Sequence, residues 1–131
     1  MYNKVIAIGR LTATPELQKT ASDKSLVRAT LAVNRRYKAA NGEREADFLN
    51  LVLWGRLAES LASYASKGSL ISLDGELRTR HYEREGQKHY VTEILGHGFQ
   101  LLESRAQRAV RENNSGADLA DLVLEAEDLP F

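Results

Sequence analysis

The stretch DFLNLVLW, residues 47–54, alternates in a way that is typical of a β-strand with two different faces. Successive side chains of a strand point to opposite sides of the sheet. One face carries Leu49, Leu51 and Leu53. The opposite face carries Phe48, Asn50, Val52 and Trp54, the single tryptophan of the chain. The leucine face predicts a core, so the two rings on the other face need a different explanation.

The length and composition indicate one small domain followed by a tail. A chain of 131 residues fits one domain, and roughly 100 residues can bury a core without staples. The chain has no cysteine, which excludes disulfides and thiolate metal sites and fits a reducing compartment. No segment approaches the roughly 20 apolar residues of a membrane span, and the start does not read as a secretory signal. We therefore expect a cytoplasmic protein without a membrane segment.

The net charge of zero hides an asymmetry along the chain. Residues 1–106 hold 16 Lys/Arg and 12 Asp/Glu, a balance of +4, whereas residues 107–131 hold two basic and six acidic residues, a balance of −4. A basic body joined to an acidic end predicts two different partners, or an end that competes for the ligand of the body.

The rest of the pattern predicts four more strands and one helix. The additional strands are expected at 3–11, 25–36, 69–83 and 89–103. The segment 55–68 changes to helical spacing and ends in Gly68, a typical C-cap residue. Asn41-Gly42 predicts a hairpin before the third strand, and Gly75 a bulge. Five strands with one helix between strands 3 and 4 predict an all-β OB-fold, a five-stranded, partly open Greek-key barrel.

The domain organisation follows from where this pattern ends. The OB-fold domain is expected to span 1–104, and the strand pattern dissolves from about Arg105. We expect 105–124 to be a short flexible linker and 125–131 to be an acidic interaction tip, together forming a disordered acidic C-terminal tail.

Basic residues recur beside aromatic residues at the edges of the predicted sheet. They form three groups along the chain: Arg35, Arg36, Tyr37 and Lys38; Trp54 and Arg56; and Arg78, Arg80, His81 and Tyr82. Rings stack on bases at about 1–3 kcal/mol per base, and cations attract phosphates. A single exposed ring is often an interface residue, and a single arginine is usually a solvated charge. Recurrence in three places favours binding of unpaired nucleic acid.

No motif indicates catalysis. The chain lacks a Gly-rich phosphate loop, a G-x-S-x-G turn and an H-E-x-x-H helix. His81, His89 and His97 are not spaced as metal ligands. We therefore expect no enzyme activity, no catalytic residue, no metal and no cofactor.

Several segments together resemble the bacterial single-stranded DNA-binding protein family over essentially the whole length. The segments that carry the likeness are NKVIAIGRLTATPE, TLAVNRR, ADFLNLVLWGRLAE, YASKGS, LDGELRTRHYE and the terminal EDLPF. The resemblance implies an OB-fold core, a homotetramer and sequence-tolerant binding of single-stranded DNA. It also implies a C-terminal tip that recruits DNA replication, recombination and repair proteins.

The resemblance assigns roles to individual positions. Base stacking falls on Phe48, Trp54, Tyr82 and Tyr37. Contacts to the DNA backbone fall on Lys4, Arg56, Lys67 and Arg80, and the charge pattern adds Arg35, Arg36 and Arg78. Asn50 and His81 stand where family members often carry a basic residue. Partner binding falls on Asp128, Leu129, Pro130 and Phe131.

The sequence leaves several alternatives open. The short linker is typical of compact members, which sometimes accompany a full-length copy and in some cases serve DNA uptake in natural transformation. The chain fits either a housekeeping or such an accessory copy. Two other functions also fit an OB-fold with exposed rings: a protein-interaction module, and a binder of single-stranded RNA of the cold-shock type.

Overall fold

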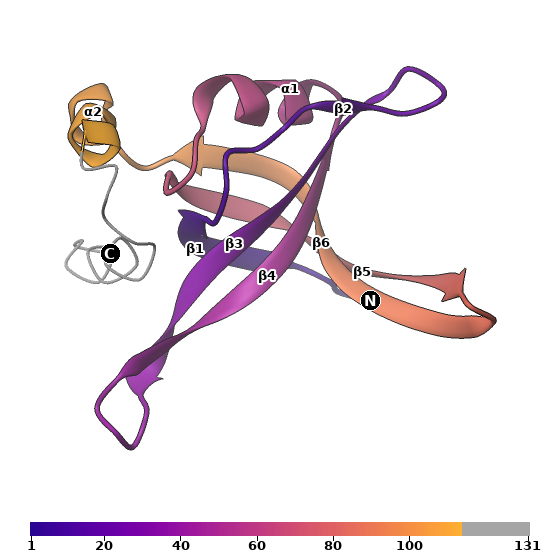
Figure 1. Ribbon diagram of the computed structural model, residues 1–131, viewed down its shortest axis with the longest axis horizontal. Helices are drawn as coiled ribbons and strands as arrows, with labels where there is room; N and C mark the ends of the chain where they lie inside the picture. Colours follow the sequence, from indigo (N-terminus) through magenta and orange to yellow (C-terminus); the bar gives the residue numbers. More distant parts are fainter. Residues whose placement is uncertain (114–131) are drawn as a thin grey trace.

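Five strands close into a mixed barrel in the computed structural model, which describes residues 1–113 (Figure 1). These strands are β1 (Val5–Leu11), β3 (Ser25–Lys38), β4 (Arg44–Trp54), β5 (Leu70–Arg84) and β6 (Gln87–Leu101). The helix α1 (Gly55–Tyr64) lies between β4 and β5, which confirms the predicted OB-fold order. A strand of two residues, β2 (Gln18–Lys19), was not predicted, and α1 ends before the predicted end at residue 68.

The sheet closes because β1 pairs with strands on both of its sides. The strand order is β1-β5-β6-β4-β3-β2, and β1 also pairs with β3 at Arg10 and Leu11. The contact between β4 and β6 is parallel, whereas the other pairings are antiparallel. A closed sheet has one interior, and the apolar face of every strand must point into it.

The leucine face of β4 lies in this interior, as predicted. Leu51 and Leu53 are almost fully buried and Leu49 is partly buried against the same cluster. The helix α1 adds Ala58 and Leu61 to this core. One residue of the opposite face differs from the expectation, because Val52 is also buried.

Two glycines allow the strands to approach closely enough to close the barrel. A Cβ atom at Gly9 would lie 2.3 Å from the carbonyl oxygen of Ala32, where β1 crosses β3. A Cβ atom at Gly75 would lie 2.2 Å from the carbonyl oxygen of Leu95. The register of β5 and β6 shifts between Asp74 and Gly75, which confirms the predicted irregularity at this glycine.

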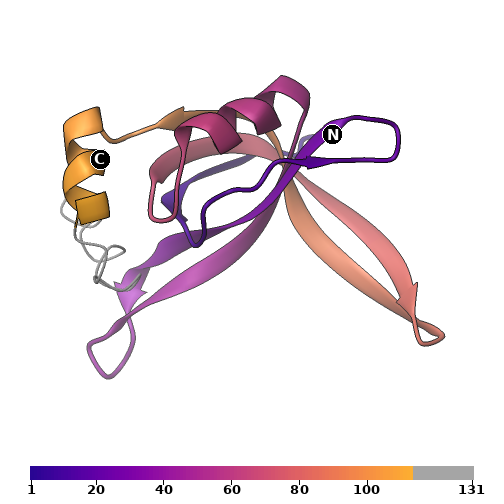
Figure 2. The ribbon, with the colours of Figure 1, turned by 45° about the horizontal axis from the view of Figure 1, so that its top comes forward.

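Two long hairpins diverge from the barrel (Figure 2). The β3–β4 hairpin turns at Gly42, which has a φ of 84° and donates its N–H to the carbonyl of Ala39, as the Asn-Gly pair predicted. The β5–β6 hairpin turns through Glu85 and Gly86, both with positive φ. Positive φ at both central residues is the signature of a type I′ turn, whose twist matches that of the flanking strands.

The expected linker begins instead with a helix, α2 (Arg105–Asn113). The first nine residues of the expected linker are thus helical. The reason is a tertiary contact, because Arg111 is buried and donates to Glu103 at 2.7 Å, to Ser69 at 3.2 Å and to the carbonyl of Lys67. The pairing of a buried arginine with a carboxylate offsets the cost of removing both charges from water.

A second contact fixes α2 from the solvent side. Glu112 accepts hydrogen bonds from Arg108 at 2.9 Å and from Ser66 at 3.0 Å. These bonds, first of all the one from Arg108, lower the pKa of Glu112 below its usual value. The helix is thus tied to the loop that follows α1.

The rest of the expected linker, and the tip at 125–131, lie outside the described residues. Within residues 1–113, no helix is long and apolar enough to cross a membrane, and no three His, Cys, Asp or Glu side chains gather as metal ligands.

We expect Arg111→Met to release α2 from the barrel. The substitution removes the nearer of the two guanidinium partners of Glu103 and the hydrogen bond to Ser69, so the free energy of unfolding should fall by about 1–3 kcal/mol. Urea unfolding measures this fall, and amide hydrogen exchange should show lost protection in α2. The matched control is Arg105→Met, an exposed arginine of the same helix. Equal stability and exchange in the two variants would contradict the anchoring role of Arg111.

Candidate nucleic-acid interface

The outer face of β4 presents its aromatic rings to solvent. Phe48 is 61% exposed and Trp54 is 42% exposed. The antiparallel register places Ala32 opposite Phe48 and Leu26 opposite Trp54. Neither neighbour is large enough to cover a ring within the described chain. The two rings are therefore available to a flat apolar ligand.

Between these rings, β3 contributes polar side chains to the same face. The register places Thr30 opposite Asn50 and Arg28 opposite Val52. The hydroxyl of Thr30 lies 3.3 Å from the side-chain oxygen of Asn50 and donates to it. The face thus alternates rings with polar and cationic groups, as a surface for bases and phosphates requires.

The β5–β6 hairpin carries a second ring with a cation beside it. Tyr82 is 41% exposed and stacks on His89 across the hairpin, with ring centroids 5.2 Å apart. The guanidinium carbon of Arg80 lies 5.9 Å from the centroid of the Tyr82 ring. This distance is within the range of a cation–π interaction. The arginine therefore connects Tyr82 with the centre of the site.

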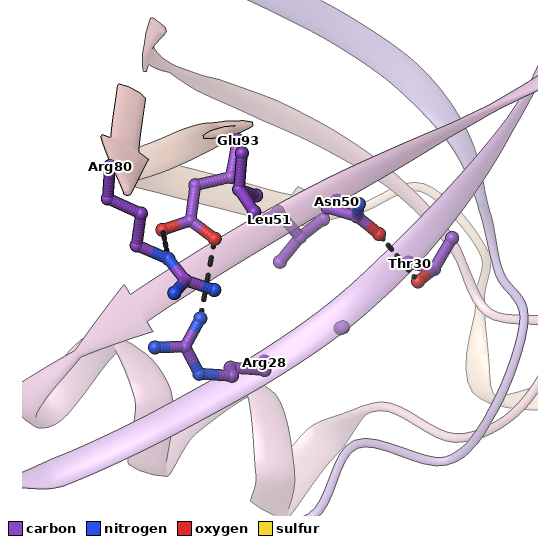
Figure 3. Close-up of a pocket in the computed structure, with 8 residues that line it drawn as sticks. Arg28, Thr30, Asn50, Leu51, Arg80 and Glu93 are labelled. Carbon is purple, nitrogen blue, oxygen red and sulfur yellow. Dashed lines mark hydrogen bonds and ion pairs between the residues drawn. The ribbon is translucent and has the colours of Figure 1, made fainter. Parts of the chain in front are cut away.

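A cavity of about 240 Å³ lies between the two hairpins. Arg28 and Asn50 line it from the β3–β4 side, and Arg80 and Glu93 from the β5–β6 side (Figure 3). Both arginines bind the same carboxylate: Arg28 Nη1 lies 3.3 Å from Glu93 Oε2, and Arg80 Nε lies 3.0 Å from Glu93 Oε1. This shared ion pair joins the two hairpins at the middle of the exposed face.

The structure places the other expected residues less centrally. Arg35 binds Glu45 at 2.7 Å and Asp47 at 2.9 Å. The hydrogen bond to Asp47, followed by the charges of Asp47 and Glu45, raises the pKa of Arg35 above its usual value. Its positive charge is thus already balanced by two carboxylates of β4.

Tyr37 and Arg36 are exposed near the end of β3, and Tyr37 is among the most exposed rings of the described chain. Arg78 lies 3.8 Å from Glu76 on β5. Arg56 is exposed in the first turn of α1, and Lys4 is exposed just before β1. These residues border the two hairpins and the barrel rather than forming one cluster.

Lys67 lies in a different place, in the loop between α1 and β5. Its N–H donates to Thr14 at 3.0 Å, and its carbonyl accepts from Arg111 of α2. The side chain is exposed. The loop backbone is thus fixed from both sides, and α2 holds the position of this lysine.

Sequence reasoning missed Arg28 and Glu93 as members of the site. The alternation of 25–36 already put Arg28 and Thr30 on one face, so antiparallel pairing with β4 could have identified Arg28. Nothing near Glu93 marks it in the sequence, because its partners come from β3 and β5.

An OB-fold barrel with exposed rings and arginines on one face is typical of proteins that bind single-stranded nucleic acids. A model of the single-strand binding protein family matches residues 2–102. The chain belongs to this family, which confirms the resemblance inferred from its motifs. The family consists of DNA-binding proteins rather than enzymes, so the expectation that the chain is not an enzyme also holds.

Curated relatives agree with this assignment. The chain is 73% identical to "Single-stranded DNA-binding protein 2" of Streptococcus agalactiae serotype V, and the match covers all of both chains. It is 71% identical to "Single-stranded DNA-binding protein 1" of Streptococcus pyogenes serotype M6, again over both full lengths. A "Single-stranded DNA-binding protein 2" of S. pyogenes serotype M18 is 51% identical over 82% of this chain and 67% of its own.

Proposed function

We propose that the protein binds and protects single-stranded DNA without regard to sequence, through the outer face of β4 and the adjoining β5–β6 hairpin. The observation that carries the proposal is the exposure of Phe48 and Trp54 on one strand face, beside the paired arginines Arg28 and Arg80. Flat rings hold bases by their faces, and every base has such a face. Binding of this kind is therefore sequence-tolerant.

The residues divide into two roles. Stacking is assigned to Phe48, Trp54, Tyr82 and Tyr37. Backbone contacts are assigned to Lys4, Arg36, Arg56, Lys67, Arg78 and Arg80, and to a lesser degree to Arg35, whose charge Glu45 and Asp47 already balance. A strand held in this way cannot pair with a complement, and nucleases cannot reach it. Affinity should fall as salt rises, because bound phosphates release counterions.

Alanine at the two β4 rings tests the stacking role. We expect Phe48→Ala and Trp54→Ala each to weaken binding of a dT oligomer by about 1–3 kcal/mol per lost stack. The fluorescence of Trp54 in the wild-type protein should be quenched at saturation, because the indole lies against a base. Fluorescence anisotropy of a labelled oligomer measures the first effect, and intrinsic emission measures the second.

Tyr64→Ala is the matched control, because this ring is 61% exposed but lies at the end of α1 rather than on β4. Paired titrations with DNA and RNA oligomers distinguish a DNA binder from an RNA binder of the cold-shock type. Wild-type affinity in both β4 variants, with an unquenched indole, would instead favour the interaction-module alternative.

We further propose that the protein acts as a homotetramer, and β1 offers a surface for assembly. Ile6 and Ile8 are 69% and 40% exposed on the outer face of β1. On one side β1 pairs with β5 along Val5–Arg10, whereas on the other side it pairs with β3 only at Arg10 and Leu11. The described chain thus leaves most of one β1 edge open, and an open apolar edge favours pairing with another chain.

Charge placed on this strand tests the assembly. We expect Ile6→Lys/Ile8→Lys to lower the mass measured by sedimentation from a tetramer to a smaller species, because buried lysines oppose an apolar interface. Val110→Lys is the control, since Val110 is 62% exposed on α2. A tetramer that persists in the double variant would contradict the role of β1.

Two finer proposals rest on the family resemblance. The first is that the tip residues recruit replication, recombination and repair proteins in the cytoplasm; these residues are Asp128, Leu129, Pro130 and Phe131. Unchanged partner capture after deletion of 125–131 would contradict this role.

An accessory role in natural transformation is the second proposal. Its support is the short linker, which resembles that of compact members that accompany a full-length copy.

A further inference from the structure

In the cavity between the hairpins, the two arginines are more exposed to solvent than the carboxylate that they share. The side chain of Glu93 is only 12% exposed, whereas those of Arg28 and Arg80 are 44% and 43% exposed. Among residues 1–113, Glu93 is the single acidic residue that lines the cavity. Two guanidinium groups and one carboxylate leave a local charge of +1 that faces solvent.

Each guanidinium has donors left over for a ligand. Within the described residues, Arg28 bonds to Glu93 through Nη1 and Arg80 through Nε. The other nitrogens of both groups make no hydrogen bond within that part of the chain. Arginine presents its donors in a rigid fork that matches the oxygens of a phosphate. Because Glu93 holds both forks, they are oriented before any ligand arrives.

The lining favours a phosphate over a base or a free small molecule. No aromatic ring of the described part of the chain lines the cavity, so a base would find no stacking partner there. A volume of about 240 Å³ is below the roughly 300–1,000 Å³ of typical small-molecule sites. A single charged group of a longer chain fits both the size and the charge.

The position of the cavity agrees with the path of a strand. Phe48 and Trp54 are six residues apart on one face of β4, a distance of about 20 Å at 3.4 Å per residue. A strand that stacks on both rings must cross the segment between them. Asn50 lies in that segment, and Arg28 pairs with Val52 of the same segment.

From this geometry we propose that Arg28 and Arg80 form a subsite for one backbone phosphate of the bound strand, with Glu93 as the residue that positions them. The proposal rests on the proposed binding of single-stranded DNA, and it adds Arg28 and Glu93 to the site. Arg28 supplies a direct contact, whereas Glu93 acts only through the two arginines.

The test compares salt dependences for a dT oligomer of roughly ten nucleotides, within the site size of one OB-fold. For Arg28→Met, the slope of log K against log salt should fall in magnitude by about 0.7, the value for one phosphate of a single strand. This corresponds to an affinity loss of about threefold at 0.2 M salt and about eightfold at 0.05 M. Quenching of Trp54 at saturation should not change.

Two further variants separate a phosphate contact from a general charge effect. Arg28→Met/Glu93→Gln keeps the net charge of the wild-type protein and leaves no carboxylate short of a partner. We expect it to lose slope and affinity as the single variant does. Arg105→Met removes one exposed positive charge from α2 and should leave both quantities unchanged.

A dT oligomer with neutral methylphosphonate linkages provides the ligand control, because it keeps the bases and removes the backbone charge. Arg28→Met and the wild-type protein should bind this oligomer equally. The subsite would be overturned by a wild-type slope in Arg28→Met, by recovery in the double variant, or by an equal loss in Arg105→Met. If the wild-type protein failed to bind dT at all, the proposed function itself would fail.

Discussion

The closure of the sheet is the constraint on which the rest of the structure depends. A closed barrel has one interior, and the leucine face of β4 fills it together with residues of β1, β3, β5 and α1. Strand geometry then leaves Phe48 and Trp54 on the outside, because adjacent side chains of a strand point to opposite faces. The burial of the leucines therefore fixes the exposed position of the two rings.

The two hairpins convert this face into an extended surface. Both continue beyond the barrel and diverge, so Tyr82 lies on a different strand pair from Phe48 and Trp54 (Figure 2). Glu93 connects the pairs through Arg28 and Arg80. Ion pairs with exposed partners contribute little to stability. The contacts of Glu93 with Arg28 and Arg80 therefore contribute more to the orientation of the two guanidinium groups than to the free energy of unfolding.

A second polar cluster lies beside α2. Arg10 and Arg111 both approach Glu103, at 3.7 and 2.7 Å, and all three side chains are buried. Arg111 also contacts the loop that carries Lys67. The end of α2 is therefore held against the loop that carries Lys67, a residue proposed to contact DNA.

The sequence by itself determined the succession of five long strands along the chain, the helix after the third of them, the hairpin turn at Gly42, the irregularity at Gly75 and the outward rings of β4. These are local properties, because period-2 alternation and turn chemistry depend on neighbouring residues. Only the tertiary structure decided that Val52 is buried, that Glu93 joins Arg28 to Arg80, that Glu45 and Asp47 balance Arg35, and that residues from Arg105 form a helix. Each of these depends on groups distant in sequence or on neighbouring strands, and alternation along one strand contains no information about which charges meet across the fold.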